Sequence, residues 1–414
     1  MSDITAPAYR PNYKYVLLLG SMCALGAIST DMYLPNLPDV QTDLRSTASA
    51  AQFTITAMLI GNAFGQLVVG PLSDRFGRRL PVLIGIGLHV LVSALCALAP
   101  AMMPLIVFRG CQGFFNASAG VVAMAVIRDR FVGRDASRLM SRLMLVIGVA
   151  PLFAPTIGGY IGQWVSWRGI FAVLGLYGVA LFTVVALKLP ETLPVERRIP
   201  SVGATRHGYA ILLRDRSFMT LAMLPALNQS ILMCYVVGSP YVFKKGYGLG
   251  TTEFGLLFAA MGVGLIVGAQ VNAALVRHHT PATILRAVLP TMAVLTCWLF
   301  VVSYTGLGGL PLLLISLFAV CFCINFGPPN ASSLALGRHG ERAGTAAACI
   351  GCLQFGVAGV IAPLVGALGE TAVAMSGVMC AAAVLALGVA ALGTPLYRRG
   401  GVARLDRDSL RRPD

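Results

Sequence analysis

Residues 51–99 read AQFTITAMLIGNAFGQLVVGPLSDRFGRRLPVLIGIGLHVLVSALCALA, and the fold can be inferred outward from this stretch. Two apolar runs, 51–72 and 80–99, flank a short turn that carries four charged side chains. An apolar run of about 20 residues is long enough to cross the hydrocarbon core of a bilayer as a helix. The stretch therefore predicts two membrane-spanning helices joined by a tight polar turn.

The composition of the whole chain agrees with this interpretation, because 57% of its 414 residues are hydrophobic and only 11% are charged. Soluble domains carry about 25% charged residues, so a soluble surface is excluded. Twelve apolar runs are long enough to span a membrane: 14–37, 51–72, 80–99, 101–127, 139–162, 169–188, 218–241, 254–275, 283–304, 311–333, 344–367 and 373–395. We therefore expect an all-α polytopic membrane protein with 12 transmembrane helices.

The basic residues predict how the chain is oriented. An even number of spans puts both termini on one side. If that side is the cytoplasm, 26 of the 31 Lys and Arg residues lie in cytoplasmic segments. The outer loops then hold only Arg45, Arg168, Lys244 and Lys245. This excess of inner positive charge is the usual pattern in membrane proteins. It accounts for the net charge of +15 without nucleic acid, and membrane lipid is the expected neighbour of the basic loops.

Loops, tails and helix ends account for all charged residues except two that lie well within the predicted spans, Asp31 in the first and Arg109 in the fourth. An ionisable group at the middle of a spanning helix costs about 2.5–3.5 kcal/mol on insertion, so it is a candidate for function, with a structural ion pair as the alternative. Asp31 lies about 10 Å and Arg109 about 12 Å from the outer ends of their helices. This similar depth predicts that both groups border one polar cavity, paired directly or through water, and couple it to protons.

The chain divides into two halves of six spans around a polar segment. The predicted parts are an N-terminal bundle (1–188), a central cytoplasmic loop (189–217), a C-terminal bundle (218–395) and a basic cytoplasmic tail (396–414). A weak internal repeat supports duplication, since Ala154-Pro-Thr-Ile-Gly158 returns as Ala362-Pro-Leu-Val-Gly366 in the corresponding span of the second half. Parallel halves with a binding site between them are one architecture of transporters.

Four motifs carry a family resemblance. They are Gly70-Pro-Leu-Ser-Asp-Arg-Phe-Gly-Arg-Arg79 in the quoted turn, Arg109-Gly-Cys-Gln-Gly113, Gly148-Val-Ala-Pro-Leu-Phe-Ala-Pro-Thr-Ile-Gly-Gly159, and Ser29-Thr-Asp-Met-Tyr-Leu-Pro-Asn-Leu-Pro38. The first three are each similar to a motif of the major facilitator superfamily. Together the four motifs resemble its bicyclomycin-resistance/CflA group of drug:proton antiporters, whose members include chloramphenicol and florfenicol exporters. The first half carries most of the resemblance, which implies the major facilitator fold.

The resemblance also implies a conformational gate. It implies that Asp74 locks the two halves through arginines and through the start of the eleventh span. A carboxylate near a helix N-terminus is stabilised by roughly 0.3–1 kcal/mol, weak enough to break in each cycle. A simple tight turn and close helix packing are the alternatives. The predicted gate residues are Gly70, Asp74, Arg75, Gly77, Arg78, Arg79, Gly148, Pro151, Pro155, Gly158 and Gly159.

Polar and aromatic residues within the spans are candidates for binding substrate. The family architecture places the first, fourth, seventh and tenth spans around the cavity. The predicted substrate-binding residues are Asp31, Tyr33, Gln112, Asn116, Asn228, Gln229, Tyr235 and Asn325. Other polar residues in spans, such as Asn62, Gln66 and Gln354, are further candidates for lining the cavity, and most of them are expected to form hydrogen bonds between helices.

Together these features favour a proton-driven exporter of small amphipathic drugs in the cytoplasmic (inner) membrane. A proton from outside protonates Asp31, which weakens the hold on the drug or on Arg109 and lets the halves rock. The sequence contains no GxxxxGK[ST] motif, so ATP is not the expected energy source. No cofactor or metal is expected, since Cys349-Gly-Ile-Cys352 has no second pair. We expect a monomer whose partners are drug-like molecules, protons and lipid.

Proton-coupled uptake or export of a metabolite by the same fold stays open as the alternative. An enzyme is not expected, because the spans hold no intramembrane cluster of His, Asp and Glu and no nucleophile–base constellation. A channel is also disfavoured, because the spans hold no ring-forming polar motif.

Overall fold

A computed structural model describes residues 13–131, 133–198, 202–337, 339, 343–398, 400–403 and 405, and the side chains of residues 13, 14, 128, 133–152, 197, 202–207 and 343 lie outside this description. Within these ranges the regular structure is entirely helical. Its main helices are α1 (Tyr13–Asp31), α2 (Leu37–Asp43), α3 (Ala48–Phe76), α4 (Arg79–Ala97), α5 (Met102–Arg130), α6 (Gly133–Lys188), α7 (Val202–Arg214), α8 (Arg216–Ser239), α9 (Thr251–Leu275), α10 (Pro281–Thr305), α11 (Gly309–Ile324), α12 (Gly327–Gly337), α13 (Ala343–Ile361), α14 (Leu364–Ala367) and α15 (Ala372–Gly393).

Eleven helices in the described part of the chain are long and apolar enough to cross a membrane. The difference from the expected twelve lies in α6, which contains both of the predicted spans 139–162 and 169–188. The backbone between these spans leaves the helical region at Ser166, with φ 67° and ψ 166°. A non-glycine residue with this positive φ interrupts the helix, so α6 consists of two helical stretches joined at a kink.

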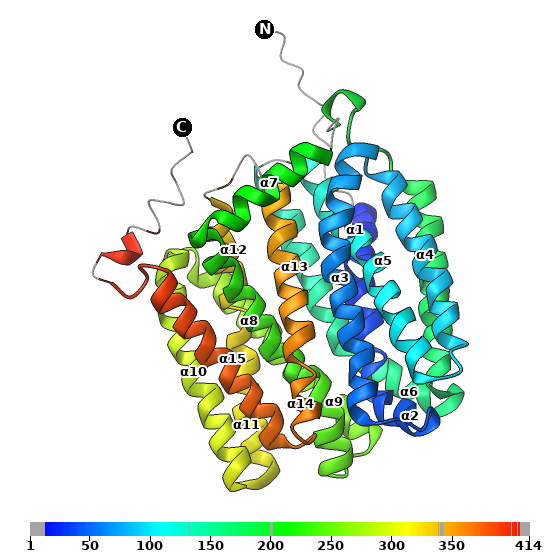
Figure 1. Cartoon of the computed structure of the whole chain (residues 1–414), viewed down its shortest axis with the longest axis vertical. Helices are drawn as coiled ribbons and strands as arrows, with labels where there is room; N and C mark the ends of the chain where they lie inside the picture. Colours follow the sequence, from blue (N-terminus) through cyan, green and yellow to red (C-terminus); the bar gives the residue numbers. More distant parts are fainter. Residues whose placement is uncertain are drawn as a thin grey trace.

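The helices run side by side, and Figure 1 shows what lies at each end of the molecule. The short helix α7 crosses the end at which α1 begins and α15 finishes, and α2 lies at the opposite end. We call these the α7 end and the α2 end. A 3-10 helix, η1 (Leu34–Asn36), and a π-helical turn, η3 (Pro240–Gly246), continue α1 and α8 toward the α2 end.

The helices contact one another in two groups. In the first group α3 packs along α5, and α4 contacts both α5 and α6, while α1 lies against α5 and α6. In the second group α8 contacts α12, α13 and α15, and α10 lies against α11 and α15. The groups meet chiefly where α3 contacts α13 and where α6 contacts α9. The space between the two groups is therefore bounded on one side by the pair α3 and α13, and on another side by the pair α6 and α9.

Glycines hold α3 against α5 without intervening side chains. A Cβ atom at Gly113 of α5 would lie 1.9 Å from the carbonyl oxygen of Met58 in α3, and one at Gly65 would lie 2.4 Å from the carbonyl oxygen of Phe114. Small residues allow such close approach of spanning helices. This contact brings the polar faces of α3 and α5, with Asn62 and Asn116, to one wall of the interior space.

Candidate functional site

A cavity of about 950 Å³ lies between the two groups of helices. Its deep part is lined by Asp31 at the end of α1, by Asn116 of α5 and by Tyr235 of α8. Its lining continues to the α7 end, where Asp74 and Tyr209 border it. None of the described lining residues belongs to α2, η1 or η3. The cavity therefore reaches from the interior to the α7 end, and the α2 end is separate from it.

Asp31 is the last residue of α1 and is 6% exposed. Its carboxylate forms no hydrogen bond and no ion pair with any residue that the structure describes. The carboxylate also lies beside the last backbone carbonyl groups of the helix, which carry partial negative charge. A carboxylate at this position is not satisfied by any of the described residues, so it is available to a proton or to a ligand in the cavity.

Arg109 of α5 is buried completely and does not line the cavity. Its Nη1 donates to the carbonyl oxygen of Ser29 at 3.1 Å and to Oε1 of Gln112 at 2.6 Å. The guanidinium lies 4.7 Å from the ring centroid of Tyr33 and 5.6 Å from that of Phe171. A guanidinium over aromatic faces gains cation–π attraction, which is stronger away from water. Arg109 is thus held by α1 and by rings, and it forms no ion pair with Asp31.

Gln112 connects Arg109 to a second buried polar group. Its Nε2 donates to Oγ of Ser93 in α4 at 2.8 Å, while its Oε1 accepts from Arg109. Ser93 in turn donates to the carbonyl oxygen of His89 at 2.7 Å. Nε and Nη2 of Arg109 have no hydrogen-bond partner in the described part of the chain. This network ties α1, α4 and α5 together behind the cavity wall.

The structure separates the eight predicted substrate-binding residues into two sets of four. Asp31, Asn116, Gln229 and Tyr235 line the cavity. The others are engaged in packing outside the described lining, namely Tyr33, Gln112, Asn228 and Asn325. The Tyr33 hydroxyl accepts a hydrogen bond from Thr54 at 3.2 Å. Nδ2 of Asn228 donates to the carbonyl of Ile324, and Nδ2 of Asn325 to that of Leu265, both at 2.8 Å.

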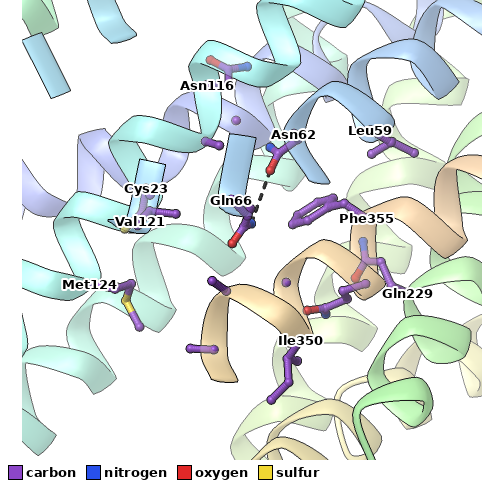
Figure 2. Close-up of a pocket in the computed structure, with 18 of the residues that line it drawn as sticks. Cys23, Leu59, Asn62, Gln66, Asn116, Val121, Met124, Gln229, Ile350 and Phe355 are labelled. Atoms are coloured by element: carbon purple, nitrogen blue, oxygen red, sulfur yellow. Dashed lines mark hydrogen bonds between the residues drawn. The ribbon is translucent and has the colours of Figure 1, made fainter. Parts of the chain in front are cut away.

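Several lining residues were not among the predicted binding set. Asn62 and Gln66 of α3 point toward the cavity and share a hydrogen bond of 3.3 Å, which Figure 2 shows as a dashed line. Gln354 and Phe355 of α13 and Phe258 of α9 also line it. The spacing of Asn62 and Gln66 by four residues, which puts both amides on one helix face, was the available signal. Phe258 and Phe355 carry no such signal, because apolar residues fill the spans throughout.

The predicted gate turn lies at the α7 end and is held by a charge cluster. Arg78 forms ion pairs with Asp74 and with Asp129 of α5, the latter at 2.8 Å from Nε to Oδ2. Gly77 adopts φ 89°, a conformation that favours glycine, and a Cβ there would lie 2.4 Å from Oε2 of Glu191. These ion pairs lie within the first group of helices.

Glu191, which follows α6, caps this turn. Its carboxylate accepts hydrogen bonds from the backbone N–H groups of Arg78, Arg79, Thr192 and Leu193 at 2.8 to 3.2 Å. Although partial burial raises the pKa of the Glu191 carboxyl, these four donors stabilise its ionised form, and the pKa lies below its ordinary value. The capping role of Glu191 was not predicted, because it depends on the return of α6 to the α7 end.

The remaining gate residues of this turn lie at the cavity edge or on the surface. Gly70 lines the cavity, and a Cβ there would lie 4.0 Å from Cβ of Ala348 in α13. Arg75 stacks over the ring of Phe76 at 5.2 Å. Asp74 borders the cavity together with Thr345 near the start of α13, and its ion-pair partner is Arg78. The expected lock between Asp74 and the second group therefore stays a prediction for another conformation.

At the α2 end, α6 packs tightly against the segment that follows α1. Nδ2 of Asn36 donates to the carbonyl oxygen of Gly158 at 3.0 Å. A Cβ at Gly158 would lie 1.9 Å from the carbonyl oxygen of Met32, and one at Gly162 would lie 1.8 Å from Oδ1 of Asn36. Nζ of Lys244 in η3 donates to the carbonyl of Pro35 at 3.1 Å. These contacts leave no space for a side chain.

The other predicted residues of the α6 motif have different surroundings. Pro155 is buried, and a Cβ at Gly159 would lie 2.8 Å from Cγ2 of Thr251 in α9. Gly159 therefore contributes to the contact between α6 and the second group of helices. Gly148 and Pro151 belong to α6, but they lie outside the residues whose side chains the structure describes.

The family model of the Major Facilitator Superfamily matches residues 17–363. The chain belongs to the major facilitator superfamily. This major facilitator protein is 38% identical to the uncharacterized MFS-type transporter YdgK of Bacillus subtilis, over 92% of its own length and 95% of the relative. It is 30% identical to a bicyclomycin resistance protein homolog of Haemophilus influenzae, over 87% and 90% of the two chains.

Its fold is similar to that of solved transporters. A crystal structure of a D-xylose-proton symporter superposes with a TM-score of 0.72 at 17% identity, covering 90% of this chain and 97% of the other. This likeness concerns the fold alone. The family membership and the long apolar helices make the protein a multi-pass transporter of the cytoplasmic membrane, and not an enzyme.

Proposed function

We propose that this transporter exports small amphipathic drugs in exchange for protons by alternating access. The observation that carries the proposal is the position of Asp31. Its carboxylate borders the deep part of a drug-sized cavity and has no partner among the described residues. Pockets for small molecules have volumes of about 300–1,000 Å³, so a cavity of about 950 Å³ is large enough for a drug.

The proposal includes 12 spans with both termini in the cytoplasm. A helix of 56 residues would be about 84 Å long, far more than the roughly 30 Å of a hydrocarbon core. The kink at Ser166 therefore divides α6 into two spans, and the count becomes twelve. With the basic segments in the cytoplasm, the α7 end is cytoplasmic and the cavity opens inward. The two bundles are then residues 1–188 and 218–395, joined by the loop 189–217 and followed by the tail 396–414.

In the proposed cycle the drug enters the cavity from the cytoplasmic side while Asp31 is ionised. The halves then rock, so that the α2 end opens and the cluster of Asp74 and Arg78 approaches α13. A proton from outside binds Asp31 and releases the drug outward. The tight contacts of Gly158 and Gly162 with the segment after α1 are the ones that must separate. The proton gradient supplies the energy, with no cofactor, and one chain suffices as a monomer.

Efflux can be tested in cells that lack their own drug exporters. Cells that express the chain should tolerate higher concentrations of several amphipathic drugs and accumulate less of a fluorescent one. A protonophore should abolish the difference at constant ATP. If expression instead raises accumulation of every probe that responds, the metabolite-uptake alternative replaces the proposal. Cells with an empty vector serve as the control.

The proposed topology has its own test. A reporter enzyme that is active only in the cytoplasm is fused to the N-terminus, or to the C-terminus after residue 414. Activity of both fusions is expected for 12 spans with inner termini. Activity of only one fusion would mean an odd number of spans, and activity of neither would reverse the orientation.

A further inference from the structure

We infer that Lys244 keeps the α2 end of the transporter closed, and that it acts against a tendency to open that the buried amide of Gln52 creates. Lys244 is therefore a positioning residue of the transport cycle, because its hydrogen bond determines how readily the α2 end opens. The inference rests on the proposed function in one respect, namely that the α2 end opens during transport. It does not depend on which substrate crosses or on proton coupling.

Hydrogen bonds between the two halves of the chain lie at its two ends. In the described part, two such bonds join residues 13–198 to residues 202–405. At the α7 end, the hydroxyl of Tyr209 donates to the carbonyl oxygen of Leu67 at 3.2 Å. At the α2 end, Nζ of Lys244 donates to the carbonyl oxygen of Pro35 at 3.1 Å. Because the α2 end is closed, its opening has to separate Lys244 from Pro35.

Both acceptors are carbonyl groups that a proline leaves without its usual backbone donor. Pro71 lies four residues after Leu67 in α3, and it has no N–H to complete the helical hydrogen bond. Pro38 lies three residues after Pro35, so it cannot complete the 3-10 pattern of η1 either. A side chain of the other half supplies the missing donor in each case. The ammonium of Lys244 is the stronger donor, since a charged hydrogen bond is roughly twice as strong as a neutral one.

The π-helical turn η3 places two adjacent lysines against different halves of the chain. Within it the N–H of Tyr247 donates to the carbonyl oxygen of Val242, five residues earlier, at 3.1 Å. Turns of this kind are rare and occur frequently at functional sites. Lys244 reaches η1, which follows α1 of the first group. Nζ of Lys245 instead lies 3.5 Å from Oε2 of Glu370, which follows α14 in the second group.

Gln52 of α3 makes the closed α2 end unfavourable. Its side chain is fully buried, and neither Oε1 nor Nε2 has a hydrogen-bond partner in the described part of the chain. The amide lies against Gly366 of α14, where a Cβ would be 2.1 Å from Oε1. A buried polar group without a partner is destabilising, and water that enters an open α2 end would satisfy it. Gln52 therefore favours opening, and the hydrogen bond of Lys244 offsets this effect.

Packing contacts between the halves at this end involve small residues. A Cβ at Gly159 of α6 would lie 2.8 Å from Cγ2 of Thr251, and one at Gly255 of α9 would lie 3.1 Å from Oγ1 of Thr156. Small residues allow helices to approach closely, and such packing adds no charged hydrogen bond. Loss of the bond from Lys244 should therefore change how often the α2 end opens.

Hydrogen–deuterium exchange of the full chain in lipid nanodiscs tests this without any substrate. Lys244→Met retains an unbranched apolar side chain and removes the ammonium group. Amide exchange at the α2 end should become about tenfold faster, because a hydrogen bond to a charged group contributes at least this factor. The acceleration should be shared by peptides from η1, η3 and α14, since all three separate when the halves open. Lys244→Arg keeps a charged donor and should exchange as the wild-type chain does.

Lys245→Met is the matched control, because Lys245 is adjacent and equally charged but its partner Glu370 lies in its own half. It should leave exchange at the α2 end unchanged. Unchanged exchange in Lys244→Met would overturn the inference. So would an acceleration that is confined to η3, which would mean local loosening, or an equal acceleration in Lys245→Met.

Gln52→Met tests the opposing contribution. It replaces the amide by an apolar group of similar length, so exchange at the α2 end should become slower. In the double variant Lys244→Met/Gln52→Met the two effects should cancel, and exchange should return to within about threefold of wild type, since the two contributions are of similar size. Exchange in Gln52→Met that is unchanged or faster would overturn the inference.

These outcomes are separate from those that test drug export. If Lys244→Met accelerates exchange across the α2 end and cells with the wild-type chain gain no drug tolerance, the inference stands and the proposed function fails. If the chain exports drugs against a proton flux but Lys244→Met exchanges as wild type does, the inference fails and the proposed function stands.

Discussion

Asp31 and Arg109 are the two charged residues that lie well within the predicted spans, and their surroundings in the structure are opposite. Arg109 is completely buried and is held by a backbone carbonyl, an amide and two aromatic rings. Asp31 lies at the end of a helix, borders the cavity and has no partner among the described residues. The protein satisfies the charge of Arg109, whereas the described residues leave the carboxylate of Asp31 available to a proton or a ligand that enters the cavity.

The difference shows that burial alone does not distinguish structural from functional charges in a membrane. Burial of either charged group costs free energy of desolvation, and only Arg109 offsets this cost through fixed contacts with the protein. An unpaired carboxylate can change its protonation state without breaking the fold. We therefore expect changes at Asp31 to affect transport, and changes at Arg109 to affect stability first.

The largest effect is expected from Asp31→Asn. Drug resistance should fall to the level of cells without the protein, because an amide cannot take up and release the coupling proton. The free energy of unfolding should change by less than about 1 kcal/mol, since no hydrogen bond is lost. Resistance assays and unfolding of the purified protein measure the two quantities. Wild-type resistance in this variant would remove Asp31 from the mechanism.

Arg109→Ala is expected to destabilise the protein by at least about 3 kcal/mol. The Ser29 carbonyl and the Gln112 amide would lose a charged donor, each worth about 1.5–3 kcal/mol, and the attraction to Tyr33 would vanish. Denaturant unfolding in detergent measures the change. Arg109→Lys is the control, since it retains a buried cation with fewer donors. Its stability should lie between those of the wild-type chain and of Arg109→Ala. A fully stable Arg109→Ala protein that cannot transport would instead assign Arg109 to the transport cycle.

A smaller effect is expected from Gln112→Leu, which removes the bridge between Arg109 and Ser93. Nη1 of Arg109 would keep only the Ser29 carbonyl, and Oγ of Ser93 would lose a donor. The loss of stability should be about 1–2 kcal/mol, and transport should remain measurable. Ser93→Ala removes the acceptor of the hydrogen bond from Gln112, and it should lower the stability by less than Gln112→Leu does. Unchanged stability in both variants would mean that the network does not hold Arg109.

The smallest effect separates the two roles of Tyr33. Tyr33→Phe removes the hydroxyl that accepts from Thr54 but keeps the ring beside Arg109, so it should cost about 0.5–1.5 kcal/mol. Tyr33→Leu also removes the ring and should cost about 0.5–2 kcal/mol more. The comparison is made by unfolding, with Thr54→Val as the control for the hydroxyl. Equal stability of the Phe and Leu variants would exclude a contribution from the cation–π contact.

Much of the fold was predictable from the sequence because hydrophobic length sets the spans. The run 51–72 lies within α3, and α4 covers the run 80–99 as far as Ala97. The segment between the two runs contains Asp74 and Arg78, which the structure pairs. The backbone of α6 leaves the helical region at Ser166, which lies in the gap between the predicted spans 139–162 and 169–188. Family membership followed from motifs of the first half and is confirmed by the match over residues 17–363.

The site was less predictable, because depth along a helix does not determine which way a side chain faces. Asp31 and Arg109 were placed at similar depth, yet α1 turns the first toward the cavity, and α5 turns the second toward Tyr33. Asn325 had the chemistry of a binding residue but donates to the Leu265 carbonyl. Such choices depend on helix rotation and on neighbours far away in the sequence, and a single sequence does not contain them.

The central claim is that Asp31 carries the proton that is exchanged for drug. The most direct measurement uses proteoliposomes that contain a pH-sensitive dye, in which an imposed drug gradient should drive protons in the opposite direction. We predict that the wild-type chain produces this pH change and that Asp31→Asn, reconstituted at equal density, produces none. A pH change of wild-type rate in Asp31→Asn would contradict the account.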